Sequence, residues 1–177
     1  MTEKPPKLPY RESVGIMLIN KRGRVWVGRR VPKWQEDTSD YIWQMPQGGI
    51  IMGEKPSHAA LRELKEEVGT DNVKILGKSA DWLSYDLPDE LLGVALGGRY
   101  CGHKYKWFAM RYLGADDEID ISGKDRNKAE FDDWRWVHVR KIEDLGISFK
   151  ENVYHKVIKE FGQLVKRPAR KKVRKCA

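Results

Sequence analysis

Three glutamates at helical spacing are the residues of this chain whose arrangement most directly suggests chemistry. On a helix, Glu63 would lie beside both Glu66 and Glu67, because the three residues have i, i+3 and i, i+4 spacing. Clustered carboxylates repel one another unless a cation lies among them. A set of oxygen ligands without His or Cys favours Mg²⁺ or Mn²⁺ over zinc. The competing interpretation is a solvated acidic face, which is the better one for an isolated ExxEE pattern.

A glycine-rich loop precedes these glutamates at a fixed distance and contains Gly48 and Glu54. Pro56 suits the start of a helix and Gly69 suits its end. Between them, apolar residues recur at helical spacing, namely Ala60, Leu61, Leu64 and Val68. We therefore expect a helix that packs its apolar side on the protein while its acidic side faces an opening. The loop in front of the helix favours a metal site over a solvated face.

The segment from Gly48 to Thr70 resembles the signature of the Nudix hydrolases, GX5EX7REUXEEXGU, in which U is an aliphatic residue. Thr70 is the one departure, because it stands where the signature has an aliphatic residue, and it replaces no ligand. The positions that match are Gly48, Glu54, Arg62, Glu63, Leu64, Glu66, Glu67 and Gly69.

The resemblance implies metal-assisted hydrolysis of a diphosphate linkage, with Mg²⁺ as the expected cofactor and Mn²⁺ or another divalent cation as the alternative. Glu63, Glu66 and Glu67 match the family's metal ligands, and Glu63 and Glu67 also belong to the expected catalytic set. Gly48 matches a position whose backbone carbonyl adds a ligand. Three further residues are expected to support them: Arg62 by holding Glu66, Glu54 by tying the loop to the helix, and Gly69 by ending the helix.

A further carboxylate is expected from outside the signature, and Glu130 is the candidate. It lies in AEFDDWRWV, which resembles a PEFxxWxWV-like stretch of related hydrolases whose glutamate contacts metal or activates water. Ala129 replaces the proline of that stretch and leaves the glutamate in register. The alternative is an ordinary surface glutamate.

Other segments of the chain suggest the substrate class. WQMPQGG, WLSYDLP and GHKYKWF resemble the branch that contains dinucleoside polyphosphate hydrolases and bacterial RNA pyrophosphohydrolases. The resemblance makes Phe149 a candidate to stack on a base of RNA and Lys150 a candidate to meet a phosphate, while Phe149 could equally be a core residue at a helix start. His103 and His138 have no partner at metal-ligand spacing and receive no catalytic role. The candidate phosphate contacts are Arg11, Arg30, Lys104 and Lys106.

Three functions remain open on these grounds. The first is a Mg²⁺-dependent pyrophosphohydrolase that acts on the 5′-triphosphate end of RNA and so initiates RNA decay. The second is a hydrolase of dinucleoside polyphosphates, which would use the same metal cluster. The third, from another class, is an RNA-binding module that keeps the fold without the chemistry, and the intact acidic positions disfavour it.

Charge and composition indicate which partners and which cellular location to expect. The 177 residues carry a net charge of +8, and seven of the basic residues lie in 166–177, which contains no acidic one. This tail is expected to be disordered and to attract RNA or another polyanion, with a solubilising role as the alternative. No apolar run is long enough to span a membrane, and the N-terminus lacks the apolar core of a signal peptide. We expect a cytoplasmic protein with free thiols at Cys101 and Cys176, and no oligomeric state is indicated.

The elements that must position these residues are expected to form one domain over residues 13–165, between an extended lead-in over 1–12 and the tail. Strands are expected at 13–20, 24–30, 41–46, 73–76, 80–85, 104–112 and 134–139, with a second helix over 148–165. Residues 31–40 are expected to form a surface loop, and residues 86–100 are expected to be mostly connection. Helices interleaved among short strands favour an α/β fold, and the resemblance implies a Nudix-type α/β/α sandwich with a mixed β-sheet.

Overall fold

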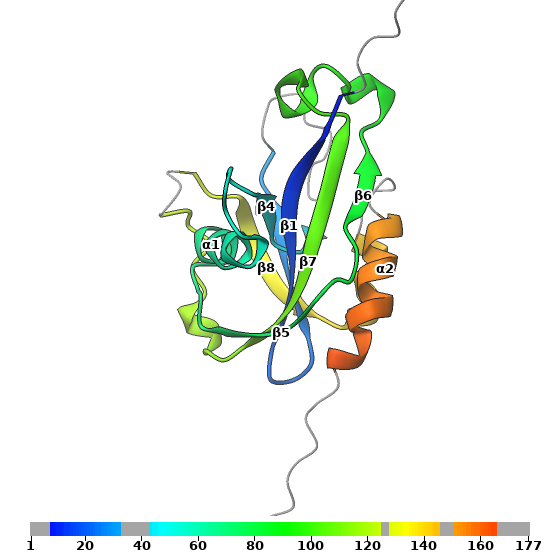
Figure 1. Ribbon diagram of the computed structural model, residues 1–177. Helices are drawn as coiled ribbons and strands as arrows, with labels where there is room; N and C mark the ends of the chain where they lie inside the picture. Colours follow the sequence, from blue (N-terminus) through cyan, green and yellow to red (C-terminus); the bar gives the residue numbers. More distant parts are fainter. Residues whose placement is uncertain (1–7, 33–42, 125–127, 146–150, 166–177) are drawn as a thin grey trace, which may run out of the picture.

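The computed structural model describes residues 8–32, 43–124, 128–145 and 151–165. A mixed sheet carries helix α1 (Pro56–Val68) on one face and helix α2 (Glu151–Phe161) on the other (Figure 1). The expected α/β/α sandwich is confirmed. Within the described ranges, no helix is both long enough and apolar enough to cross a membrane.

The centre of the sheet is a parallel pair formed by β1 (Tyr10–Ile19) and β7 (Gly102–Tyr112). Their register runs without a break from Tyr10 opposite Gly102 to Ile19 opposite Arg111. Shorter antiparallel strands flank the pair, so that each central strand has different neighbours at its two ends. Those beside β1 are β4 (Gln47–Gly49) and β2 (Val25–Arg30), those beside β7 are β6 (Leu83–Asp86) and β5 (Val73–Lys78), and β3 (Trp43–Gln44) and β8 (Phe131–Val137) pair with β2.

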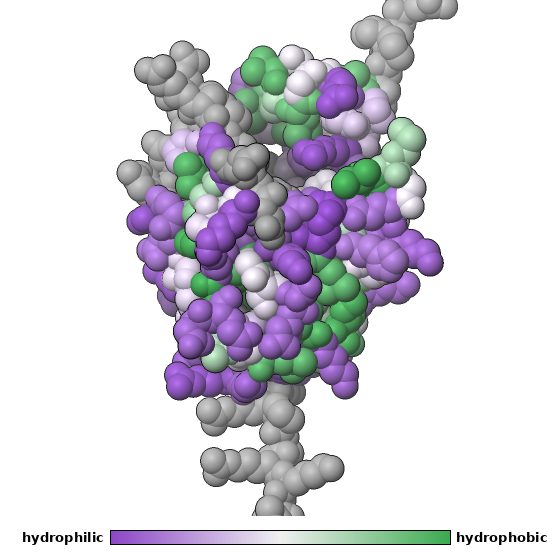
Figure 2. All heavy atoms as spheres, turned by 90° about the vertical axis from the view of Figure 1, so that its left-hand side faces the viewer, coloured by the Kyte–Doolittle hydropathy of each residue, from purple (hydrophilic) through white to green (hydrophobic). Residues whose placement is uncertain are grey.

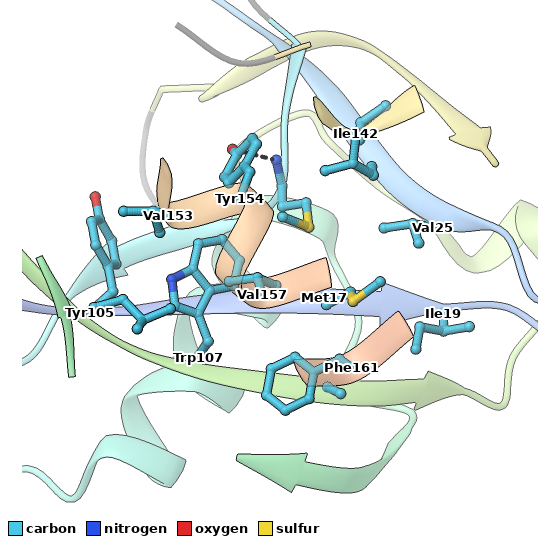
Figure 3. Packing of buried hydrophobic residues seen from close by; sticks show 14 residues of the cluster. Met17, Ile19, Val25, Tyr105, Trp107, Ile142, Val153, Tyr154, Val157 and Phe161 are labelled. Carbon is cyan, nitrogen blue, oxygen red and sulfur yellow. Dashed lines mark hydrogen bonds between the residues drawn. The ribbon is translucent and has the colours of Figure 1, made fainter. Parts of the chain in front are cut away.

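Two hydrophobic cores lie on opposite faces of this sheet, because successive strand residues point to opposite sides. Met17 and Trp107 belong to the core beneath α2, whereas Ile16 and Phe108 belong to the core beneath α1. Figure 3 shows the first core, in which Val157 and Phe161 of α2 lie over Trp107 and Met17. The sheet is therefore buried on both faces, which fixes the alternation of every side chain along β1 and β7.

Helix α1 begins and ends as expected. Pro56 occupies its first turn, where the missing backbone N–H costs nothing. Gly69 follows the last helical residue with φ of 78°, and its N–H donates to the carbonyl of Lys65. Glycine adopts this left-handed conformation without strain, and a β-carbon here would come within 2.5 Å of the carbonyl of Asp120.

Several expected boundaries were wrong. Strand β1 starts at Tyr10, inside the expected lead-in, because Tyr10 and Arg11 pair with β7. The signature loop contains an unexpected strand, β4, whose two glycines have low strand propensity. Strand β8 begins at Phe131 rather than Trp134. The expected second helix ends at Phe161, where α2 gives way to a 3₁₀ turn at Gly162–Val165. The segment 86–100 is mostly connection, as expected, and contains the 3₁₀ turns Asp89–Leu91 and Ala95–Gly98.

Candidate active site

The acidic residues of α1 lie directly under strand β4. The carboxylate of Glu63 is packed against Gly48, and a β-carbon at that glycine would come within 1.9 to 2.3 Å of its atoms. The backbone N–H of Gln47 donates to Oε2 of Glu67 at 3.0 Å. Both glutamates are 3% exposed. The expectation that the acidic side faces an opening was therefore wrong for these two residues, because β4 covers them.

Arg62 links the loop to the glutamate cluster. Its guanidinium donates to both carboxylate oxygens of Glu54, from Nε at 2.9 Å and from Nη2 at 2.8 Å. Nη2 also donates to the carbonyl of Gly49 at 2.9 Å. Nη1 donates to Glu63 at 2.8 Å and, more weakly, to Glu66 at 3.4 Å. Arg62 therefore contacts Glu63 more closely than Glu66, and Glu54 links the helix residue Arg62 to the backbone N–H of Ile51 in the loop.

Four carboxylates gather in this cluster. Glu54, Glu63 and Glu66 accept hydrogen bonds from Arg62, while Glu67 accepts one from the backbone N–H of Gln47. The hydrogen bond from Arg62 lowers the pKa of Glu54 to about 2, so that this carboxylate is ionised at neutral pH. Carboxylates gathered in a mostly buried region repel one another, and a cation among them relieves this repulsion.

A divalent cation suits this donor set. Nudix hydrolases generally use divalent cations, and the oxygen atoms supplied here are hard ligands of the kind that such ions prefer. As placed, the acidic and histidine side chains of the described ranges do not converge in groups of three on one metal position. Arg62 lies between the carboxylates of Glu63 and Glu66 instead, so that bringing them onto one ion requires side-chain rotation.

Arg11 lies against Gly49, the residue that follows Gly48 in strand β4. A β-carbon at Gly49 would be 2.4 Å from Nη2 of Arg11, which places the guanidinium beside that glycine. Tyr85 lies near Arg11, because the charge of Arg11 acts on its hydroxyl. Burial raises the pKa of Tyr85 to about 12, although Tyr105 and the charges of Arg11 and Arg30 oppose the rise. Tyr85 is therefore a neutral hydroxyl beside two cations.

His103 was given no role from the sequence, yet it lies in this region. It is opposite Arg11 in the sheet register, and its Nδ1 is 3.0 Å from Oγ of Ser13. Its ring stacks on Tyr85 and Tyr105, with centroids 5.5 and 5.3 Å apart. The alternation along β7 predicts that 103, 105 and 107 share one face, but only the parallel register of β1 with β7 sets His103 beside Arg11.

Arg30 and Glu130 come together although a hundred residues separate them in sequence. Nε of Arg30 is 3.9 Å from Oε1 of Glu130, and both side chains are mostly buried. The backbone N–H of Val31 donates to the carbonyl of Glu130 at 2.9 Å, which fixes the two segments side by side. Glu130 is therefore a partner of a candidate phosphate-binding arginine rather than a free surface glutamate.

Lys104 and Lys106 lie apart from Arg11. They lie on the α1 face of the sheet, together with Phe108. Arg11 and Ser13 lie on the opposite face. Nζ of Lys104 pairs with Glu12 at 2.8 Å, and Nζ of Lys106 donates to the carbonyl of Ala80 at 2.9 Å. Both ammonium groups lie within about 6 Å of the Trp82 ring. The structure thus does not bring the four candidate phosphate contacts together. Phe149, Lys150 and the 166–177 tail lie outside the described residues.

A hollow is visible on the face that carries α1. Figure 2 shows it between the uppermost lobe of that face and the main body, with hydrophilic residues beneath it. The lobe corresponds to the segment with the 3₁₀ turns Asp89–Leu91 and Ala95–Gly98 at the top of Figure 1.

The fold and the glutamate cluster define a hydrolase of the Nudix class. A model of the NUDIX domain matches residues 9–157, and the chain belongs to this family. The match covers the glycine-bearing strand, α1 and Glu130, and it ends within α2.

Curated relatives resemble the chain over almost its whole length. A protein of Rhodospirillum rubrum named RNA pyrophosphohydrolase is 49% identical over 174 residues, which cover 96% of this chain and 100% of the relative. A protein of Bartonella clarridgeiae with the same name is 47% identical over 157 residues, covering 87% of this chain and 91% of the relative.

Solved structures confirm the fold. The dihydroneopterin triphosphate pyrophosphohydrolase of E. coli has a TM-score of 0.60 at 19% identity, covering 86% of this chain and 99% of that one. An Ap4A hydrolase of C. elegans has a TM-score of 0.57 at 16% identity, covering 85% of this chain and 98% of that one. At these identities the likeness concerns architecture and says nothing about substrate.

Proposed function

We propose that this protein is a Mg²⁺-dependent pyrophosphohydrolase that acts on the 5′-triphosphate end of RNA. Two relatives of nearly full length and almost half-identical sequence carry that activity in their names. The observation that carries the proposal is the pair of buried glutamates, Glu63 and Glu67, which α1 of the signature holds directly under β4. Arg11 lies against Gly49, the next residue of that strand, so that the glutamates and a cationic side chain flank β4 on its two faces.

The carboxylates of Glu63, Glu66 and Glu67 would hold the metal, with the backbone carbonyl of Gly48 as a further ligand. When bound, a divalent cation neutralises phosphate oxygens and lowers the pKa of a water molecule. Mn²⁺ has the same ligand preferences and is the alternative. Arg62 orients Glu63 through the 2.8 Å hydrogen bond, while the backbone N–H of Gln47 donates to Glu67.

Glu130 is proposed to act together with Arg30. An arginine that binds a phosphate oxygen while a neighbouring carboxylate orients it is a common arrangement, because the guanidinium presents several donors in a fixed plane. The pairing of Arg30 with Glu130 fits this arrangement. We further propose that Glu130 accepts a proton from the attacking water when the substrate draws Arg30 toward its phosphates.

On the substrate side, Arg11 and Arg30 are proposed to bind the triphosphate. Both lie close enough to Tyr85 for their charges to act on its hydroxyl, so that the two guanidinium groups converge on one region. Tyr85 and His103 offer a neutral donor and a flat ring beside them. Phe149 and Lys150 remain proposed contacts for the first nucleotides of the RNA.

The reaction replaces one bridging P–O bond by a bond to water. Attack of water on a phosphorus atom of the triphosphate expels a phosphate-containing group and leaves RNA with a shorter 5′ phosphate chain. The chain's own residues supply charge and orientation, which account for most of the rate enhancement in phosphoryl transfer.

A direct comparison of substrates tests the proposal. Hydrolysis of 5′-triphosphorylated RNA and of diadenosine polyphosphates should be measured side by side with Mg²⁺, and the products identified. We expect kcat/KM for RNA to exceed that for the dinucleotides by about tenfold or more, which corresponds to roughly 1.4 kcal/mol of transition-state stabilisation. Preference for the dinucleotides would replace the proposal with the second function. Failure to hydrolyse either, with intact RNA binding, would favour the inactive module.

A further inference from the structure

A pocket lies at the end of the sheet opposite Arg11. It is formed by the turn between β1 and β2, the end of β7, the residues that follow it, and β8. The residues that line it are Asn20, Lys21, Arg22, Arg24, Tyr112, Gly114, Asp116 and Trp136. Arg11 and Ile19 are near opposite ends of β1, which at about 3.3 Å per residue separates the two regions by about 26 Å (Figure 1).

The floor of this pocket is aromatic. The rings of Tyr112 and Trp136 are stacked, with centroids 5.9 Å apart and an interplanar angle of 29°. Nε1 of Trp136 donates to Oδ1 of Asp116 at 3.0 Å, which fixes the ring. Tyr112 is fully buried, whereas Trp136 is partly exposed. A planar ring that is held in place and partly exposed can serve as a platform for stacking of a nucleobase.

One rim of the pocket is cationic. Lys21, Arg22 and Arg24 are exposed, and in the described part of the chain none of them forms an ion pair. Oδ1 of Asn20 accepts hydrogen bonds from the backbone N–H groups of Arg22 and Arg24, at 2.9 and 3.0 Å. The turn is therefore held by its own side chain while its cations point to solvent. By contrast, Arg29, Arg62 and Lys104 all have carboxylate partners.

The opposite rim is acidic, which narrows the range of ligands. Asp116 accepts the hydrogen bond from Trp136, and Asp117 and Glu118 follow it in the same turn. The backbone N–H of Ala115 is the main cause of a lowered pKa of Glu118, and the nearby charge of Lys21 adds to the effect. A simple anion would be repelled by this rim. A ligand with a phosphate, a flat ring and hydrogen-bond donors on its base or sugar would match all three parts of the pocket.

We propose that this pocket binds a nucleotide of single-stranded RNA downstream of the 5′ end that is being hydrolysed. The inference rests on the proposed function, because the pocket would bind a downstream part of the same RNA substrate. A base would stack on Trp136, and the adjoining phosphates would meet Arg22 and Arg24. At about 3.4 Å per stacked nucleotide, spanning about 26 Å takes roughly eight nucleotides, so only longer RNA reaches both sites.

The test uses the full chain, a double variant and a matched control. Arg22→Ala/Arg24→Ala removes two cations from the pocket, and Lys156→Ala/Lys159→Ala removes two exposed cations from α2. Hydrolysis and binding should be measured with a triphosphorylated dinucleotide and with a triphosphorylated RNA of about 15 nucleotides, which exceeds the span of the two sites.

We expect all three proteins to hydrolyse the dinucleotide equally. On the longer RNA, the pocket variant should bind about tenfold more weakly. Its slope of log K against log salt should be shallower by about 1.4, because each of the two phosphates that is no longer neutralised accounts for about 0.7. The control should match the unmodified protein. Equal binding of long RNA by all three proteins, or an equal loss on both substrates, would overturn the inference.

Two further measurements separate this inference from the proposed function. Binding of the same long RNA with a 5′-hydroxyl end requires no hydrolysis, and the pocket variant should lose affinity there too. If no protein hydrolyses RNA but this difference persists, the proposed function fails and the pocket assignment stands. A free mononucleotide that binds as tightly as the long RNA would mark a small-molecule site and would overturn the RNA assignment.

Discussion

The carboxylate of Glu63 lies directly against the α-carbon of Gly48, where no side chain fits. A β-carbon at residue 48 would come within 1.9 to 2.3 Å of three carboxylate atoms of Glu63. The glycine of the signature is thus a packing requirement of the site, in addition to any role of its carbonyl. Strand β4 approaches the helix this closely only because residue 48 lacks a side chain.

Gly48→Ala should therefore displace Glu63 and lower kcat by about 10²-fold, since a shift of about 1 Å in a catalytic group has an effect of this size. The free energy of unfolding should fall by about 0.5–3 kcal/mol, as for other overpacked sites. Turnover and thermal unfolding measure the two effects. Gly77→Ala is the control, because a β-carbon there meets only ordinary contacts at 3.9 Å. Wild-type turnover by Gly48→Ala would contradict the geometry.

The tie between Glu54 and Arg62 predicts a pH dependence of stability. The pKa of Glu54 is lowered from 4.5 to about 2 in the folded protein. A carboxyl group whose pKa is lowered by folding stabilises the protein fully above its unfolded pKa, and this stabilisation is lost as the pH falls. The loss should occur between about pH 4.5 and 2. Glu54→Gln should lack this part of the pH profile, which thermal unfolding across the range would reveal. Parallel profiles for the two proteins would contradict the tie.

Glu130→Gln tests whether the partner of Arg30 takes part in the reaction. We expect kcat to fall by about 10²–10⁴-fold, as when a positioned acid–base group is removed, with little change in thermal stability. Asp132→Asn is the matched control, because Asp132 pairs with the neighbouring Arg29 at 2.6 Å and has no proposed role. Equal kcat values for the two variants would return Glu130 to the status of a structural ion-pair partner.

Deletion of 166–177 tests the basic tail. Its seven cations lie beyond the NUDIX match, so hydrolysis of a dinucleotide should be nearly unchanged. Long RNA should bind more weakly, and a tail that contacts three phosphates would contribute about 2 to the slope of log K against log salt. An identical slope for full-length and truncated proteins would show that the tail does not contact RNA.

Much of the site was predictable because it is local in sequence. The i, i+3 and i, i+4 spacing of Glu63, Glu66 and Glu67, and the capping by Pro56 and Gly69, depend only on helix geometry. Strand β4 was not predictable from propensity, because glycines seldom form strands and this one forms through tertiary pairing with β1. The burial of Glu63 and Glu67 follows from that pairing.

Contacts between residues that are far apart in sequence could not be predicted either. The alternation of Lys104, Tyr105 and Lys106 showed that neighbouring side chains of this strand lie on opposite faces. It did not show which face Arg11 shares, since that depends on the parallel register of β1 with β7. The contact between Arg30 and Glu130 likewise arises from the pairing of β2 with β8. Neither relation leaves a periodic signal within one segment.

Turnover of Glu67→Gln tests the central claim most directly, namely that the glutamates under β4 perform metal-dependent hydrolysis of triphosphorylated RNA. Glu67 is 3% exposed and accepts a hydrogen bond from Gln47, which the glutamine oxygen can still accept, so the fold should persist. With saturating Mg²⁺ and a triphosphorylated RNA dinucleotide, we expect kcat to fall by about 10²–10⁴-fold, while Glu90→Gln on the exposed 3₁₀ turn keeps full activity. Full Mg²⁺-dependent turnover by Glu67→Gln would contradict the account.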